Sequence, residues 1–236
     1  ADCYEALWKV DQDAGENPLN LGIVLATLGR YDEALVWFRH AVEADPGDPF
    51  AWFNRGRALE KMGRYADAAE SYAEVIAGRP GDTGAHFALA TVLAELGRYQ
   101  EAIECCDQVL ASGTANSATM KLRAEMLKAV GRHKAAIEAY GRYLEVTPED
   151  RDARMALGMV LERDGGYGDA IRHYALVLKG DEHDTEAWRA LESALVHMGR
   201  YGEALECSDN IIANNPGNRA AWQRRGEILM WLGSYE

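Results

Sequence analysis

The sequence predicts an all-α protein, a solenoid in which one helix–turn–helix unit is repeated along the chain. Glycine recurs every 34 residues without insertion or deletion, at Gly29, Gly63, Gly97, Gly131, Gly165, Gly199 and Gly233. An alanine follows at a fixed offset, at Ala34, Ala68, Ala102, Ala136, Ala170 and Ala204. Apolar residues at helical spacing flank the glycines. A repeat this regular predicts that every unit folds in the same way.

The segment before each glycine is predicted to be the first helix of a unit. In the second unit Trp52, Gly56 and Leu59 are three to four residues apart, which is the period of one helical face. A residue that can accept hydrogen bonds from the free amides of a helix start precedes each such segment from the second unit onwards. These residues are Asp48, Asp82, Asn116, Asp150, Asp184 and Asn218.

The glycine is predicted to form the turn between two helices, because a positive φ is favourable only without a Cβ. The second helix then begins, and in the second unit Tyr65, Tyr72 and Val75 share one of its faces. The invariant alanine is predicted to lie where the two helices cross, since a larger side chain would push their backbones apart. Prolines end the second helix, at Pro46, Pro80, Pro148 and Pro216.

The composition argues against several classes of protein. The 236 residues contain 25 Lys+Arg and 38 Asp+Glu, and the net charge of −13 disfavours a protein that binds nucleic-acid phosphates with a basic face. The hydrophobic content of 48% is sufficient for a buried core, which argues against a disordered chain. No apolar run approaches the roughly 18 residues typical of a membrane-spanning helix.

Together these residues resemble the tetratricopeptide repeat family. The repeat length, the turn, the alanine and the proline fit the family's pattern, as do a Leu-Gly pair and an aromatic residue in the first helix, seen in Leu21-Gly22, Leu157-Gly158, Trp52, Trp188 and Trp222. The resemblance covers essentially the whole chain and implies a right-handed superhelical solenoid, an α–α superhelix. Pentatricopeptide repeats, which read RNA, have a similar period, but the acidic charge disfavours them.

The same register divides the chain into units. Six complete units are predicted, at 15–48, 49–82, 83–116, 117–150, 151–184 and 185–218. Residues 1–14 are then the second helix of an incomplete unit, and residues 219–236 are the first helix of another. A chain that begins and ends within a unit is expected to be a fragment of a longer repeat protein.

The resemblance also implies a binding surface. First helices in this family line a concave groove that usually holds an extended or helical peptide. The matching positions here are Leu19, Asn20, Ile23, Phe53, Asn54, Arg57, Phe87, Thr91, Lys121, Glu125, Lys128, Met155, Met159 and Arg189.

Within this surface two interpretations of the apolar stripe Leu19, Phe53 and Phe87 stay open. The stripe either anchors an apolar side chain of a partner or packs between neighbouring first helices. Asn20 and Asn54 share one offset in successive units, where family members often hold a ligand backbone with asparagine, although asparagine there is also common by descent. No three successive units supply the lysine, asparagine and arginine residues that clamp the C-terminal carboxylate of chaperones, so that ligand is disfavoured.

No catalytic residues, metal site or cofactor site are predicted. Cys3, Cys105, Cys106 and Cys207 include no C-x-x-C pair, and the six histidines lack the spacing of metal ligands. Adjacent Cys105 and Cys106 could form a disulfide only with strain. A reduced, cytoplasmic protein that is not an enzyme is therefore expected.

The predicted function is that of a non-catalytic scaffold that binds a peptide or protein along the groove, and neither a nucleic acid nor a membrane. The alternative is the regulatory or targeting arm of a larger enzyme whose catalytic domain lies outside this chain. End-to-end self-association is also predicted, because apolar side chains lack a covering helix at both ends. These side chains are Tyr4, Leu7 and Trp8 at one end and Trp222, Leu229 and Trp231 at the other.

Overall fold

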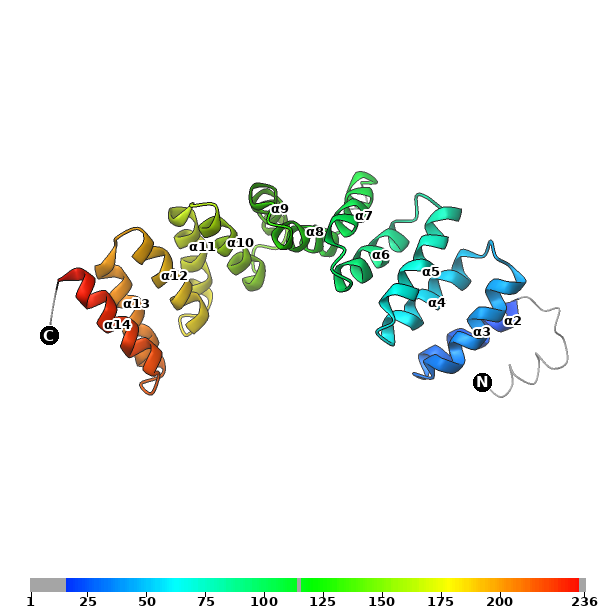
Figure 1. Ribbon diagram of the computed structural model, residues 1–236, viewed down its shortest axis with the longest axis horizontal. Helices are drawn as coiled ribbons and strands as arrows, with labels where there is room; N and C mark the ends of the chain where they lie inside the picture. Colours follow the sequence, from blue (N-terminus) through cyan, green and yellow to red (C-terminus); the bar gives the residue numbers. More distant parts are fainter. Residues whose placement is uncertain (1–15, 114–115, 234–236) are drawn as a thin grey trace. The chain divides into compact units, whose positions relative to one another are not determined.

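The computed structural model describes residues 16–113 and 116–233, and all regular structure within them is α-helical (Figure 1). The helices are α2 (Glu16–Thr27), α3 (Tyr31–Ala44), α4 (Pro49–Lys61), α5 (Tyr65–Gly78), α6 (Thr83–Glu95), α7 (Tyr99–Ala111), α8 (Ser117–Ala129), α9 (His133–Val146), α10 (Arg151–Arg163), α11 (Tyr167–Gly180), α12 (Thr185–His197), α13 (Tyr201–Asn214) and α14 (Arg219–Leu232). The prediction of an all-α helical repeat solenoid is confirmed. The predicted helix in residues 1–14 lies outside the described residues.

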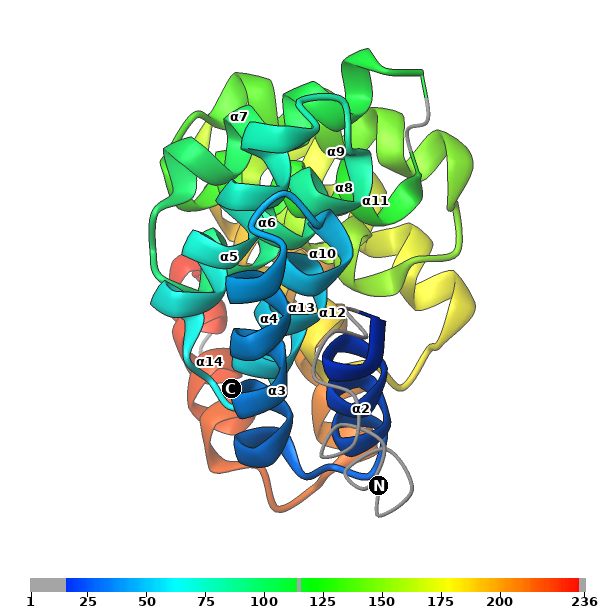
Figure 2. The same ribbon diagram turned by 90° about the vertical axis from the view of Figure 1, so that its right-hand side faces the viewer.

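The chain divides into two compact units, up to Met126 and from Leu127, and the division falls within α8. In unit 1 the hairpins are α2–α3, α4–α5 and α6–α7, and in unit 2 they include α10–α11 and α12–α13. The two helices of each hairpin lie side by side in Figure 1 and in the turned view of Figure 2. First helices of neighbouring hairpins also touch, α2 with α4 in unit 1 and α10 with α12 in unit 2. Each unit therefore has a face formed by first helices.

The turns and helix starts follow the predicted chemistry. All seven periodic glycines have a positive φ, for example 72° at Gly63 and 84° at Gly165. The predicted cap residues accept a hydrogen bond from a backbone N–H of the helix that they precede, as Asp82 does from Ala85 at 2.9 Å. A fixed turn and a fixed start give each hairpin the same length and register.

The invariant alanine lies in the core of every hairpin. All six of these alanines have no exposed surface. This complete burial is what the predicted close approach of the two helices requires, and the place of the alanine at the crossing stays a prediction.

A second crowded position lies where each first helix crosses its own second helix. It holds glycine at Gly22, Gly56 and Gly158, and the residue 16 positions later is Phe38, Tyr72 or Tyr174. A Cβ at Gly56 would lie 2.7 Å from Cε1 of Tyr72, and a Cβ at Gly22 would lie 2.5 Å from Cε1 of Phe38. The two residues of this crossing pair share one volume, so a large side chain on one helix is paired with a small residue on the other, as alanine is in the pair Ala124 and Tyr140.

In the α12–α13 hairpin the crossing pair is reversed. Glu192 takes the glycine position, 6% exposed, and fully buried Ser208 faces it. The Ser208 hydroxyl donates a hydrogen bond to the Glu192 carboxylate, and Nε of Arg224 lies 3.7 Å from the second carboxylate oxygen. Burial raises the pKa of Glu192, and Ser208, Arg224 and Arg189 partly oppose that rise.

Stability is therefore expected to depend on the protonation of Glu192. Because its folded pKa lies above its unfolded value, the contribution of this group to folding is most favourable below about pH 4 and is lost as the pH rises through the folded pKa. We expect Glu192→Gln, which keeps the shape and can accept from Ser208, to be more stable than the parent at pH 7, with the difference shrinking towards pH 4. Urea unfolding followed by circular dichroism at both pH values measures this. A difference of the same size at both would contradict it.

None of the described helices combines the length and the apolar character needed to cross a membrane.

Candidate functional site

A hollow of about 160 Å³ opens on the first-helix face of unit 1, between α2 and α4. Three of the predicted groove residues, Ile23, Asn54 and Arg57, line it together. The other lining residues are Ala26, Thr27, Tyr31, Ala58 and Lys61. The contact between α2 and α4 brings these side chains from two successive repeats into one site.

The floor of this hollow, which we call the α2–α4 hollow, is apolar and held in place. Ala58 is 2% exposed, and Ile23, Ala26 and Tyr31 pack against the core formed around Leu21 and Phe38. An apolar floor of fixed shape suits the side chain of a small apolar residue.

Two polar residues at the edge are oriented by hydrogen bonds to their own helices. Nδ2 of Asn54 donates to the carbonyl oxygen of Phe50 at 2.8 Å, and Oγ1 of Thr27 donates to that of Val24 at 2.7 Å. The Asn54 amide keeps its carbonyl oxygen and a second N–H for a ligand, which is the pair of groups that matches a peptide backbone.

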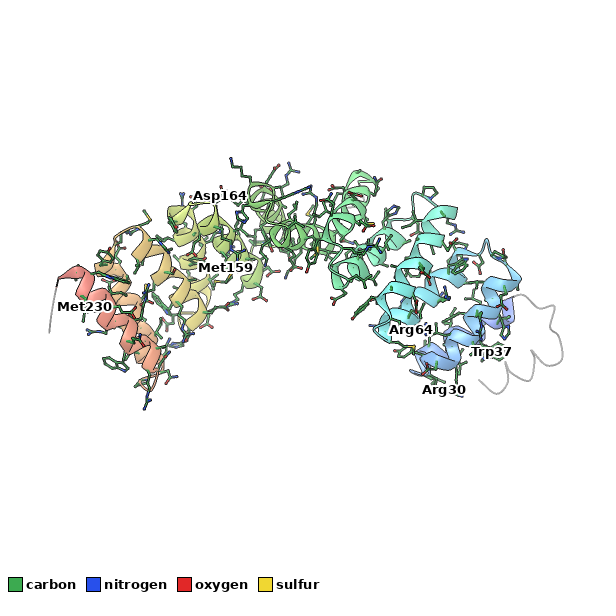
Figure 3. The ribbon with its side chains drawn as sticks, viewed as in Figure 1. Arg30, Trp37, Arg64, Met159, Asp164 and Met230 are labelled. Atoms are coloured by element: carbon green, nitrogen blue, oxygen red, sulfur yellow. The ribbon has the colours of Figure 1, made fainter. Side chains whose placement is uncertain are left out.

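The cations at the rim are not neutralised. Within the described parts of the chain, neither Arg57 nor Lys61 forms an ion pair, and both are exposed. The turn arginines in Figure 3 differ, since Arg30 contacts Glu33 and Arg64 contacts Asp67, each at 2.5 Å. In a protein with a net charge of −13, two unneutralised cations beside an apolar floor favour a ligand that carries a carboxylate.

The apolar stripe of the sequence analysis does not line the α2–α4 hollow. Leu19 packs against two groups of buried core residues, and the ring of Phe53 lies 5.5 Å from that of Tyr72. Phe87 is half-buried, and its carbonyl oxygen accepts a hydrogen bond from Thr91 at 3.0 Å. For Leu19 and Phe53 the contacts favour packing, the second of the two interpretations.

The remaining predicted residues lie apart from the hollow. Asn20 is exposed, Lys121 and Glu125 of α8 are half-buried, and Lys128 lies in the part of α8 that belongs to unit 2. Met159 of α10, labelled in Figure 3, is 39% exposed, and Arg189 of α12 is exposed.

One predicted groove residue is wrong. Met155 is only 2% exposed and belongs to the core of unit 2, so it cannot contact a partner on the first-helix face. Its offset in the unit suggested an open position, but an offset does not tell how deeply neighbouring helices bury it. Conversely, the prediction missed Tyr31, which reaches the hollow from the start of the second helix. Its position directly after the Gly-Arg turn could have indicated that it lies near the first helices.

Family comparisons agree with this architecture. A family model described as Tetratricopeptide repeat matches residues 53–117 and 122–187, more than half of the chain. The chain belongs to the tetratricopeptide repeat family. A model described as TPR repeat matches residues 22–63, and a further Tetratricopeptide repeat model matches residues 185–228. No curated protein matches the sequence significantly.

Solved structures of tetratricopeptide repeat proteins share the fold. YrrB, described as a TPR protein with an unusual peptide-binding site, is 22% identical over 79% of this chain and 96% of its own, with a TM-score of 0.69. MamA from Desulfovibrio magneticus RS-1 is 22% identical over 73% of this chain and 97% of its own, with a TM-score of 0.66. A repeat protein from Parabacteroides merdae is 14% identical, covering 97% and 90%, with a TM-score of 0.61.

The described cysteines of this tetratricopeptide repeat chain are buried or half-buried. Cys105, Cys106 and Cys207 are free thiols, and Cys3 lies outside the described residues. Burial raises the pKa of Cys105 to about 11 and the pKa values of Cys106 and Cys207 to about 12, which keeps these thiols protonated at neutral pH. Among the described residues no three His, Cys, Asp or Glu side chains are grouped as metal ligands.

Helix α14 has an exposed apolar side. Trp222 is 52% exposed and Trp231 is 47% exposed, while Arg224 stacks over the Trp231 ring at 5.1 Å. The residues predicted to meet this surface in a second copy, Tyr4, Leu7 and Trp8, lie outside the described residues. Self-association therefore stays a prediction.

Proposed function

We propose that this chain is a non-catalytic scaffold that binds a peptide segment of a partner protein on the first-helix face of its repeats, with the α2–α4 hollow as the main contact. In this proposal the repeats run in the six units from 15–48 to 185–218. The observation that carries the proposal is the pair of unneutralised cations, Arg57 and Lys61, beside an apolar floor and the Asn54 amide.

The expected ligand has three matching parts. An apolar side chain would enter the floor, the peptide backbone would bond to the Asn54 amide, and a neighbouring carboxylate would contact Arg57 or Lys61. The peptide-binding site named in the description of YrrB supports a peptide as the type of ligand.

The proposal is tested with defined peptides. We expect a fluorescein-labelled Gly-Leu-Glu-Glu-Gly peptide to bind at least about tenfold more tightly than Gly-Leu-Lys-Lys-Gly, measured by fluorescence polarisation at low salt. The charge reversal Arg57→Glu with Lys61→Glu is expected to abolish or invert this preference, because the rim cations would become anions.

A matched control separates local from global charge. Arg132→Glu with Lys134→Glu changes two exposed cations of unit 2 and alters the net charge of the protein by the same amount. It is expected to leave the peptide preference intact. If the control weakens acidic-peptide binding as much as the change at Arg57 and Lys61, the contact is non-specific and the placement of the site is wrong.

A further inference from the structure

A larger hollow, of about 540 Å³, lies in unit 2 beside the α10–α11 hairpin. One side is the turn and first residues that lead into α10, with Pro148 and Arg154, and the other side is the last turn of α11, with Leu176, Val177 and Gly180. We call it the α10–α11 hollow. Its lining residues belong to unit 2, whereas those of the α2–α4 hollow belong to unit 1. The inference drawn from it is therefore independent of the function proposed above.

The next hairpin of the same unit has a tryptophan where this hollow has Arg154. Trp188, 34 residues later, packs against Ile211, and its indole N–H donates to the carbonyl oxygen of Glu182 at 2.7 Å. At the corresponding positions Arg154 donates to the carbonyl oxygen of Pro148, and Val177 lines the hollow. Arg154 thus repeats the hydrogen bond of the tryptophan without its bicyclic ring.

The residues at the outer edge of the space around Trp188 also differ from those at the edge of the α10–α11 hollow. Around Trp188 this edge is bridged by a contact between Nδ1 of His183 and Oδ1 of Asn214, which lie 2.9 Å apart. The residues at these two positions in the earlier hairpin are Glu149 and Gly180, and Gly180 has no side chain to reach across. The hollow is therefore open where its repeat counterpart is filled and closed.

The residues around the opening suit an aromatic ring. Leu176 is 49% exposed, and Lys179 on the rim is exposed. Guanidinium groups already stack on rings in this chain, with Arg55 over Trp52 at 5.3 Å. We propose that the α10–α11 hollow binds an aromatic side chain of a partner protein, which takes the volume that Trp188 fills in the next hairpin, packs on Leu176 and Val177, and stacks against Arg154.

The test uses a single aromatic side chain as the probe. N-acetyl-L-tryptophanamide is titrated into the full chain labelled with ¹⁵N, and amide chemical shifts are followed by NMR. We expect shifts confined to residues 148–154 and 176–181, and we expect N-acetyl-L-leucinamide to bind at least about fivefold more weakly. The absence of shifts in these segments, or equal binding of the two probes, would overturn the proposal.

The repeat supplies the variant that closes the hollow. Glu149→His with Arg154→Trp and Gly180→Asn gives the three positions the residues of the α12–α13 hairpin, and a Cβ at Gly180 meets no atom within 4 Å. This variant is expected to remain folded and to lose the probe-induced shifts. Leu176→Glu, a change at an exposed position, is expected to weaken binding of the probe by at least about fivefold while the hollow itself stays open. Probe binding that survives both variants would show that the ring binds elsewhere. As a control, Arg57→Glu with Lys61→Glu in the α2–α4 hollow should leave binding of the probe unchanged.

Discussion

Replacement of Gly56 by leucine is expected to lower the free energy of unfolding by about 3 kcal/mol. The new side chain would start 2.7 Å from the ring of Tyr72. That ring has no exposed surface, its hydroxyl donates to Glu60 at 2.8 Å, and Phe53 packs on it, so it has no free space to move into. Urea unfolding followed by far-UV circular dichroism measures the loss.

Two matched variants separate crowding from a general effect of losing glycine. Gly78, in the same hairpin, has no atom within 4 Å of a built Cβ, and Gly78→Ala is expected to be neutral or to stabilise by about 0.5 kcal/mol. Adding Tyr72→Ser to Gly56→Leu is expected to recover part of the loss, because Glu192 and Ser208 show that a large first-helix residue fits opposite a serine. If Gly56→Leu unfolds like the parent, the crossing pair is not the constraint described here.

Substitution of Asp184 by alanine is expected to cost about 2 kcal/mol, from two interactions of similar size. Asp184 caps α12 by accepting from the Ala187 N–H at 3.0 Å, and it also binds Nε of Arg151, the first residue of the preceding first helix, α10, at 2.8 Å. The Asp184 side chain is 10% exposed, but that of Arg151 is 39% exposed, so solvent screening limits the ion pair to about 1 kcal/mol. Thermal and urea unfolding give the total.

Asp82→Ala is the control for the cap alone. Asp82 accepts from the Ala85 N–H at 2.9 Å and has no ion pair with any other described residue, so a loss of about 1 kcal/mol is expected. The hydrogen bond from Arg151 lowers the pKa of Asp184, so the stabilisation from that ion pair is complete above about pH 4 and is lost as the pH falls through the folded pKa. The difference between the parent and Asp184→Ala should therefore narrow on acidification below pH 4. Equal losses in the two variants at pH 7 would contradict the contribution of the ion pair between Arg151 and Asp184.

The helices, turns and caps could be predicted because local chemistry is repeated at each of them. A glycine that needs a positive φ, such as Gly63, and an aspartate that caps a helix, such as Asp82, act through neighbours a few residues away. Six repetitions of these local signals leave no ambiguity in the register. The repeat period alone therefore predicts the position of each hairpin.

The candidate sites were less predictable because they depend on how deeply each side chain lies between helices. Met155 occupies an offset that suggests an open surface, yet the packing of unit 2 leaves it 2% exposed. The α10–α11 hollow exists because three positions change together, at Glu149, Arg154 and Gly180, and the sequence does not show that these positions surround one volume. The buried position of Glu192 could not be predicted for the same reason. A carboxylate is unexpected at a helix crossing, and the sequence does not show that Ser208 and Arg224 lie beside it.

The crossing pairs have a consequence for how such an array can evolve or be redesigned. A first helix with a large crossing residue does not fit a second helix with another one, so recombination that joins the first half of one repeat to the second half of another can place two bulky residues, such as Glu192 and Tyr72, in a single volume. An exchange at the proline and aspartate that separate repeats, such as Pro46 and Asp48, moves both partners together. Chimeras cut at these linkers should fold, and duplication or deletion of whole hairpins would leave every crossing pair intact.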